Sequence, residues 1–274
     1  MKKKGLLTLI FFLCATVAFS FHEVKHLSLS AAGINTMEID CGSGFLEVTG
    51  VDGLSEIKVD AEIVLQGFSD SDAKNIMDRC VKLSLERRGT RAVLISKIEC
   101  SSMFDWGEKK IDLTVKVPKK MDLIVDDGSG SITIEDINGN LQIDDGSGSM
   151  EIKNTNGRLD IDDGSGTITL FKITGNIDIE DGSGTINIKS TTGDIDIDDG
   201  SGDIEAEDIG GKLDISDGSG SIDVRNVDGD VEVSDGSGNI YINGVEKNVF
   251  IKRDGSGSVN VQNVKGTVRM PDKE

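Results

Sequence analysis

The sequence predicts an all-β fold: a single-stranded parallel β-helix (solenoid) of 18-residue coils, preceded by an irregular N-terminal cap region with one short helix. Three observations support this prediction. A "DGSG" turn recurs at a period of 18 residues, apolar and polar residues alternate after each turn, and a second glycine-containing turn divides each period into halves. A strict short repeat is typical of coils that stack on one another.

The first twenty residues have the layout of a secretory signal peptide. Three lysines near the start of the chain are followed by an apolar stretch from Leu6 to Phe19. This stretch is too short to span a bilayer, and small residues lie close to the junction before Phe21. We therefore assign residues 1–20 as a signal peptide. The mature chain is expected to begin near Phe21, to lack a membrane span, and to be extracytoplasmic: periplasmic, at the cell surface or secreted.

Residues 21–120 are predicted to form the irregular β region that caps the solenoid. "DCGSG" at 40–44 is a first copy of the turn, with Cys41 at the position of the aspartate. The later segment "SDSDAKNIMDRC" begins with residues that cap helices and then places apolar residues on one face. One short helix is therefore expected inside the cap.

Three cysteines remain after removal of the signal peptide: Cys41, Cys80 and Cys100. An oxidising compartment permits one disulfide, and the odd number leaves one thiol over. The sequence leaves the pairing open and favours Cys80 with Cys100.

Residues 121–274 are predicted to be the regular β-solenoid repeats. The aspartate of the turn lies at positions 127, 145, 163, 181, 199, 217, 235 and 254, so the spacing is 18 six times and then 19. Between the turns aliphatic residues occupy every second position, as at Leu159 and Ile161 and again at Ile177 and Ile179. This alternation is typical of strands with one buried face, and glycines supply the turns.

The negative charge of the chain belongs to the repeats. Residues 121–274 hold 33 of the 49 acidic residues and only 12 of the 29 basic ones. An acidic surface repels polyanions and favours cations or basic partners, which excludes nucleic acid as a partner.

Three segments carry a resemblance to a known family. They are "VDGLSEIKVDAEI", "IDLTVKVPKKMDLIV" and "DGSGSITIEDINGNLQIDDGSG". In their order and motifs they resemble the putative adhesin family, domain of unknown function 4097, also called the toast-rack domain, over nearly the whole mature chain. The resemblance implies an extracytoplasmic single-stranded β-helix, and it brings no catalytic residues with it.

One short motif suggests an enzyme. "HEVKH" at 22–26 matches the H-E-x-x-H signature of zinc proteases, whose two histidines share one face of a helix. Here the motif starts one residue after the expected cleavage site, and no long apolar helix surrounds His22 and His26. We interpret the match as a coincidence and expect no enzymatic activity.

Carboxylates at one phase of the repeat suggest a cation site. Equivalent residues of stacked coils lie about 4.8 Å apart, so outward acids would form columns. One interpretation is a solvated face that prevents pairing with other strands. The alternative is calcium, which prefers many oxygen ligands. The candidate ligands, with no other cofactor expected, are Asp160, Asp178, Asp196 and Asp214 on the strands and Asp163, Asp181, Asp199 and Asp217 in the turns.

These observations lead to one functional hypothesis and one alternative. The hypothesis is a secreted, non-catalytic β-solenoid that acts as a structural or interaction (adhesin-like) module of the bacterial cell envelope, with an unknown envelope or surface protein or polymer as its partner. The alternative is a divalent-cation (calcium) binding module that uses the stacked acidic face.

Overall fold

Each 18-residue repeat folds into two strands because its aliphatic residues occupy every second position. The computed structural model describes residues 20–100 and 107–271. In the coil of β12 (Ile177–Asp181) and β13 (Gly184–Thr191), Ile177 and Ile179 are buried while Glu180 is exposed. The predicted signal peptide, residues 1–20, lies outside the described residues except for Ser20.

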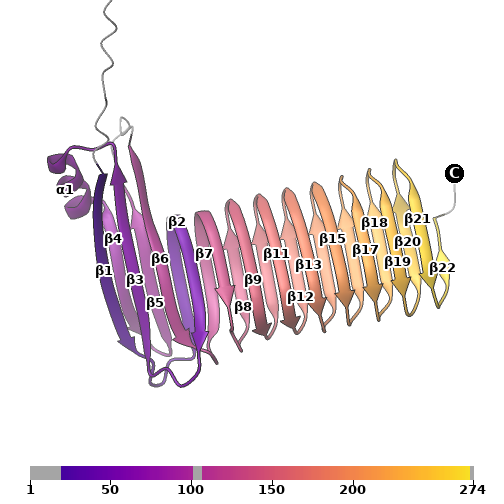
Figure 1. Ribbon diagram of the computed structural model, residues 1–274, viewed down its shortest axis with the longest axis horizontal. Helices are drawn as coiled ribbons and strands as arrows, with labels where there is room; N and C mark the ends of the chain where they lie inside the picture. The colour runs from indigo at the N-terminus through magenta and orange to yellow at the C-terminus, as the bar shows by residue number, and fades with distance from the viewer. Residues whose placement is uncertain (1–19, 101–106, 272–274) are drawn as a thin grey trace, which may run out of the picture.

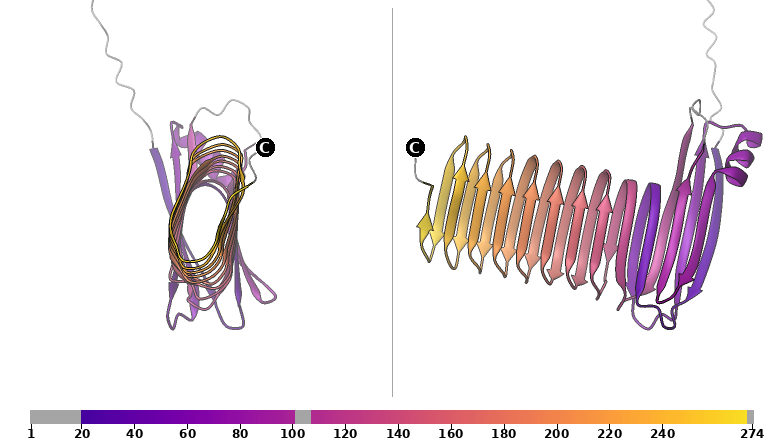
Figure 2. Two further views of the ribbon diagram at one scale, coloured as in Figure 1. Left: turned by 90° about the vertical axis from the view of Figure 1, so that its right-hand side faces the viewer. Right: turned by 180° about the vertical axis from the view of Figure 1, so that it is seen from behind.

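The coils stack along one axis into a rod (Figure 1). Each strand pairs in parallel with the equivalent strand of the next coil, so that Ile177 lies beside Ile195 and Asp178 beside Asp196. Seen from its end, the rod is a flattened ring with two long sides (Figure 2). The predicted parallel β-helix is confirmed.

The two long sides are here called face A and face B. Hydrogen-bonded neighbours along face A are β1 (Ser20–Ser30), β3 (Glu56–Gln66), β6 (Glu108–Pro118), the second halves of β2 (Thr36–Val51) and β7 (Asp122–Glu135), β9 (Gly148–Asn156), β11 (Gly166–Thr174), β13, β15 (Gly202–Ile209), β17 (Ile222–Val227), β19 (Ile240–Val245) and β21 (Val259–Val264). Along face B they are β4 (Val81–Arg88), β5 (Arg91–Ile98), the first halves of β2 and β7, β8 (Leu141–Asp145), β10 (Leu159–Asp163), β12, β14 (Ile195–Asp199), β16 (Leu213–Asp217), β18 (Val231–Asp235), β20 (Val249–Asp254) and β22 (Val268–Arg269).

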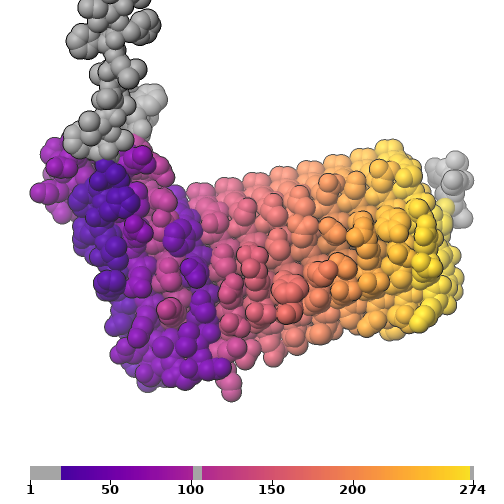
Figure 3. Space-filling view, viewed as in Figure 1, coloured from indigo at the N-terminus to yellow at the C-terminus, as the bar shows by residue number. Residues whose placement is uncertain are grey.

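The N-terminal block extends both faces, first with strands parallel to β2 and then with antiparallel strands. β2 lies on β7 in parallel register, with Cys41 beside Asp127, although residues 52–121 separate the two strands in the sequence. From β2 the sheet continues outward through β6, β3 and β1 on face A and through β5 and β4 on face B. This block is taller than the rod that extends from it (Figure 3).

The expected short helix is α1 (Asp70–Arg79). The Ser69 side chain caps its N-terminus by accepting a hydrogen bond from the Asp72 N–H, and Ala73 and Ile76 are buried. Just beyond its end, Cys80 forms a disulfide with Cys100, the pairing that the sequence favours. Cys41 is the free, buried thiol.

The core is a set of aliphatic columns that run along the rod. In the column of Ile161, Ile179 and Ile197, every side chain is at most 1% exposed. Each such side chain contributes about 1.5–3 kcal/mol on burial, before its loss of conformational entropy is counted. The inward assignment of the alternating aliphatic residues is therefore confirmed.

The "DGSG" corner packs glycine backbone against glycine backbone. At Gly184 φ is +157°, and a Cβ atom there would lie 1.7 Å from the carbonyl oxygen of Gly166 in the preceding coil. The Gly184 N–H donates to the Ser201 carbonyl oxygen of the following coil at 2.9 Å. A side chain at this position would push adjacent coils apart.

This contact predicts a large cost for the change Gly184→Ala. The methyl group overlaps a backbone oxygen that has no free space to move into, so we expect a loss of about 3 kcal/mol or more in the free energy of unfolding, measured by urea denaturation. The matched control is Gly53→Ala. Gly53 also has a positive φ, +71°, but a Cβ atom there would have no other atom within 4 Å. Its expected loss is about 1–2 kcal/mol, and equal losses would contradict the clash.

Candidate functional site

The strand carboxylates that the sequence singled out form one outward column on face B. Parallel pairing of adjacent strands places these residues side by side on successive coils: Asp160, Asp178, Asp196 and Asp214, with Glu232 continuing the column. Such neighbours lie about 4.7–4.9 Å apart. The predicted stacking of these acids is therefore present in the structure.

Basic side chains already neutralise part of this column. The guanidinium of Arg158 lies 3.1 Å from a carboxylate oxygen of Asp178, and Lys212 Nζ lies 3.3 Å from one of Asp214. Between them, burial and the carboxylates of Asp214 and Asp178 raise the pKa of Asp196. The column is thus a mixed array in which Asp196 carries the least compensated charge.

The turn carboxylates do not join this outward column, contrary to our expectation of a single acidic face. Asp163, Asp181, Asp199 and Asp217 are 1–4% exposed and lie inside the rod. The reason is strand parity, since each of these residues is two positions after a buried aliphatic residue, as Asp163 is after Ile161. The eight candidate ligands therefore fall into two sets, on opposite sides of their strands.

This separation divides the predicted calcium ligands into an outward set and a buried set. Within residues 20–100 and 107–271, no group of three or more His, Cys, Asp or Glu side chains is arranged to hold a metal ion. Calcium takes 6–8 oxygen ligands, which a single column of carboxylates supplies only with the help of water. Calcium binding at Asp160, Asp178, Asp196 and Asp214 stays a prediction.

The test is thermal melting at pH 7.5 in millimolar calcium chloride, compared with sodium chloride of matched ionic strength. If Asp196 and its neighbours bind calcium, the melting temperature rises by about 2–4 °C more in calcium for each kcal/mol of binding energy gained by the folded state. The variant Asp196→Asn should lose this excess. Equal shifts in the two salts would show ionic screening alone.

The histidines of "HEVKH" lie on a strand, not on a helix. His22 and His26 belong to β1, where His22 pairs with Glu62 at 3.1 Å and His26 with Asp60 at 2.6 Å on the neighbouring strand. A zinc protease requires both imidazoles on one helix face around the metal. This geometry excludes the zinc-protease interpretation.

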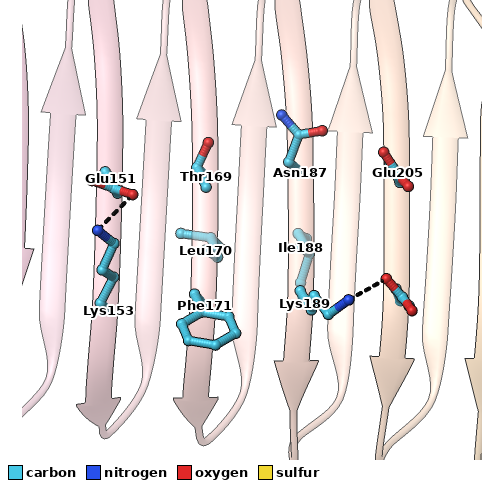
Figure 4. Close-up of a pocket in the computed structure, with 10 residues that line it drawn as sticks. Glu151, Lys153, Thr169, Leu170, Phe171, Asn187, Ile188, Lys189 and Glu205 are labelled. Atoms are coloured by element: carbon cyan, nitrogen blue, oxygen red, sulfur yellow. Dashed lines mark hydrogen bonds and ion pairs between the residues drawn. The ribbon is translucent and has the colours of Figure 1, made fainter.

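Face A carries a groove of about 500 Å³ that the sequence did not reveal (Figure 4). Phe171 follows the buried Leu170 in β11 and therefore projects outward, in a column between Lys153 and Lys189 of the adjacent coils. Other residues that line the groove include Glu151, Thr169, Asn187, Glu205 and Glu207. The groove thus combines one aromatic ring with charged and amide groups.

Two residues of this coil depart from the pattern of the repeat. The first is Phe171, because the equivalent outward position holds a charged residue on β7, β9, β13, β15 and β17. Lys172, at the following corner, has φ of +57°, and its Nζ lies 4.8 Å from the centre of the Phe171 ring. Other coils mostly place Asp or Asn at this corner, which tolerate the left-handed conformation better. These departures are the sequence signal that could have revealed the groove.

The lysines of the groove are suited to binding and not to proton abstraction. Lys153 Nζ lies 2.7 Å from Glu151 and Lys189 Nζ lies 2.6 Å from Glu207 (Figure 4). These hydrogen-bonded carboxylates raise the pKa of each lysine, so both remain protonated at neutral pH. A lysine that acts as a general base needs the opposite shift.

The model of one protein family matches more than half of the chain. The model described as Toastrack DUF4097 matches residues 56–229, from β3 through most of the rod. The chain belongs to this Toastrack family. The match includes the groove and the strand carboxylates of face B up to Asp214. No curated protein matches the chain.

Solved structures of low sequence identity are also similar to this Toastrack protein. A protein described as a putative lipid binding protein from Parabacteroides distasonis is 13% identical, with a TM-score of 0.47 over 92% of this chain and 95% of the other. A putative adhesin from Parabacteroides merdae is 14% identical, with a TM-score of 0.40 over 90% and 96%. A putative adhesin from Bacteroides fragilis is 11% identical, with a TM-score of 0.37 over 90% and 96%.

Membrane crossing by a helix finds no support in the part of the chain that the structure describes. None of its helices there combines the length and the apolar character that a span requires.

Proposed function

We propose that this Toastrack protein is an extracytoplasmic, non-catalytic interaction module, adhesin-like in character, that binds a surface protein or polymer of the bacterial envelope through face A. In this proposal residues 1–20 are a signal peptide, residues 21–120 a cap and residues 121–274 the repeats that present the binding surface. The basic start and the apolar stretch of the first twenty residues support the export of the chain.

The groove around Phe171 carries the proposal. An outward aromatic ring offers apolar area that a neighbouring ligand can cover, and aromatic side chains are enriched among the residues that dominate binding energy. Thr169 and Asn187, in register on adjacent strands, add hydrogen-bonding groups beside it. A polymer that carries both apolar faces and hydroxyl or amide groups fits this arrangement.

The absence of a catalytic role is proposed from the same groove. Its two lysines are held protonated by glutamates, and the two histidines of the chain lie on β1, in the N-terminal block. The ammonium group of Lys172 lies over the ring of Phe171, where it shapes the surface that a ligand meets. These features suit recognition.

The experiment is a sedimentation assay with insoluble cell-wall glycan and, separately, with bacterial envelope fragments that retain their surface proteins. The protein without residues 1–20 should sediment with at least one of these two materials. We expect Phe171→Ser to weaken that binding about tenfold or more, because the ring supplies most of the apolar contact.

The matched control is Phe250→Ser. Phe250 is an outward aromatic residue on β20 of face B, with the guanidinium of Arg269 at 5.6 Å from its ring centre. This variant should bind as the wild type does. Equal weakening by both changes, or no sedimentation with either material, would contradict binding through face A.

A further inference from the structure

The turn aspartates form a continuous buried column along the rod. Parallel pairing places each one beside the next, and their exposed fractions are 1–4%. This column, here called the aspartate ladder, consists of Asp127, Asp145, Asp163, Asp181, Asp199, Asp217 and Asp235.

Most carboxyl groups of the ladder accept a hydrogen bond on one oxygen and leave the other without a partner. Oδ1 of Asp181 accepts a hydrogen bond from the Ser183 N–H at 3.0 Å, and Oδ1 of Asp199 accepts one from the Ser201 N–H at 3.0 Å. Oδ2 is buried without a hydrogen-bond partner in six of the seven: Asp127, Asp145, Asp163, Asp181, Asp199 and Asp217. A buried carboxylate oxygen without a partner is unfavourable by several kcal/mol unless the group is neutralised.

The groups that face the ladder along the rod are other acids. The charges that act on Asp163 and Asp199 are those of the next ladder members, Asp181 and Asp217, and of the exposed Asp162 and Asp198. Burial, followed by the charges of neighbouring carboxylates, raises the pKa of five ladder aspartates to about 6: Asp145, Asp163, Asp181, Asp199 and Asp217. The charge of Asp144 also raises the pKa of Asp145, and the charge of Asp203 raises that of Asp217.

The two ends of the ladder are different. At the N-terminal end Cys41 lies beside Asp127 and donates a hydrogen bond to it, and burial followed by this carboxylate strongly raises the pKa of the thiol. The charge of the exposed Asp126 also raises the pKa of both groups. At the C-terminal end the register shifts by one residue between β18 and β20, and Arg253 Nε donates to the backbone oxygen of Asp235 at 3.2 Å. Arg253 lowers the pKa of Asp235 and Asp254 raises it, with burial again the first cause of the net rise.

We propose that the aspartate ladder is a proton-binding site, in which protons taken up at the orphaned Oδ2 atoms neutralise the buried column and join adjacent coils. A protonated Oδ2 becomes a donor, and equivalent residues of adjacent coils lie about 4.7–4.9 Å apart, a spacing at which one carboxyl group can donate to the next. The ligand is the proton, and the site is the interior of the corner.

The sign of the effect on stability follows from proton linkage. The folded chain binds these protons more tightly than the unfolded chain, whose aspartates have a pKa of about 3.9. The stabilisation is therefore complete below about pH 4 and is lost as the pH rises through about 6. The rod should be more stable at pH 5 than at pH 7.5.

The first experiment is thermal melting of the wild type at pH 7.5 and pH 5.0. We expect the melting temperature to rise by about 5–10 °C at the lower pH. The variant Asp163→Asn/Asp199→Asn should melt higher than the wild type at pH 7.5 and should show a pH-dependent rise smaller by about a third. Its amides keep the acceptor for the serine N–H and supply a permanent donor on the other atom.

The control removes the same charge from the adjacent, exposed positions. Asp162→Asn/Asp198→Asn should keep most of the pH-dependent rise, because these side chains point outward and burial, not their charge, is the first cause of the raised pKa of Asp163 and Asp199. If this control reduces the rise as much as the ladder variant does, the effect is general charge repulsion and the proposal is wrong.

A measurement on the wild type tests the site directly, whether or not the variants fold. In protein labelled with ¹³C at the aspartate carboxyl carbons, a set of resonances should titrate with midpoints near pH 6. Titration of all aspartate resonances below about pH 4.5 would overturn the proposal.

Discussion

The rest of the coil depends on the approach of glycine to glycine at the "DGSG" corner. A Cβ atom on Gly184 would lie only 1.7 Å from the carbonyl oxygen of Gly166, so adjacent corners are in direct backbone contact. A hydrogen bond from the Gly184 N–H to the Ser201 carbonyl oxygen holds the following corner at the same short distance. Corners fixed at this distance leave the intervening strands no freedom to slip. Every residue must then lie beside its equivalent in the neighbouring coils.

Strict register places like beside like, with different consequences outside and inside. On face B, water and the side chains of Arg158 and Lys212 compensate the stacked carboxylates. Inside the corner Oδ2 of Asp181 is buried without a hydrogen-bond partner, and the neighbouring charge belongs to another aspartate, Asp199. The same period therefore produces a tolerable surface column and an interior column that is strained in its ionised form.

The period and the alternation made most of the fold predictable, because both are local properties of the sequence. Aliphatic positions such as Ile179 and the helix after Ser69 follow from such signals. The disulfide of Cys80 with Cys100 was favoured but left open by the sequence, because the pairing depends on which cysteines meet in space. The turn aspartates were assigned by polarity, whereas strand parity continues through Asp163 and turns it inward. The groove was beyond the sequence, since it requires the spatial neighbours of Phe171. The copy "DCGSG" placed Cys41 at the position of the turn aspartate, but the direct stacking of β2 on β7 was not predicted, because a long insertion interrupts the period there.

Parity also governs how the length of the rod can change. Insertion or deletion of one whole repeat alters its reach by one strand spacing, about 4.8 Å, and leaves both ends as they were. Loss of a single residue within a strand would instead exchange inside for outside and bring carboxylates into the core. The 19-residue spacing before Asp254 is accommodated only by a local shift in register, at the far end of the rod. A gene that encodes such repeats can therefore change the length of the rod in equal steps. Duplication of the 18-residue unit is the change that keeps every column continuous.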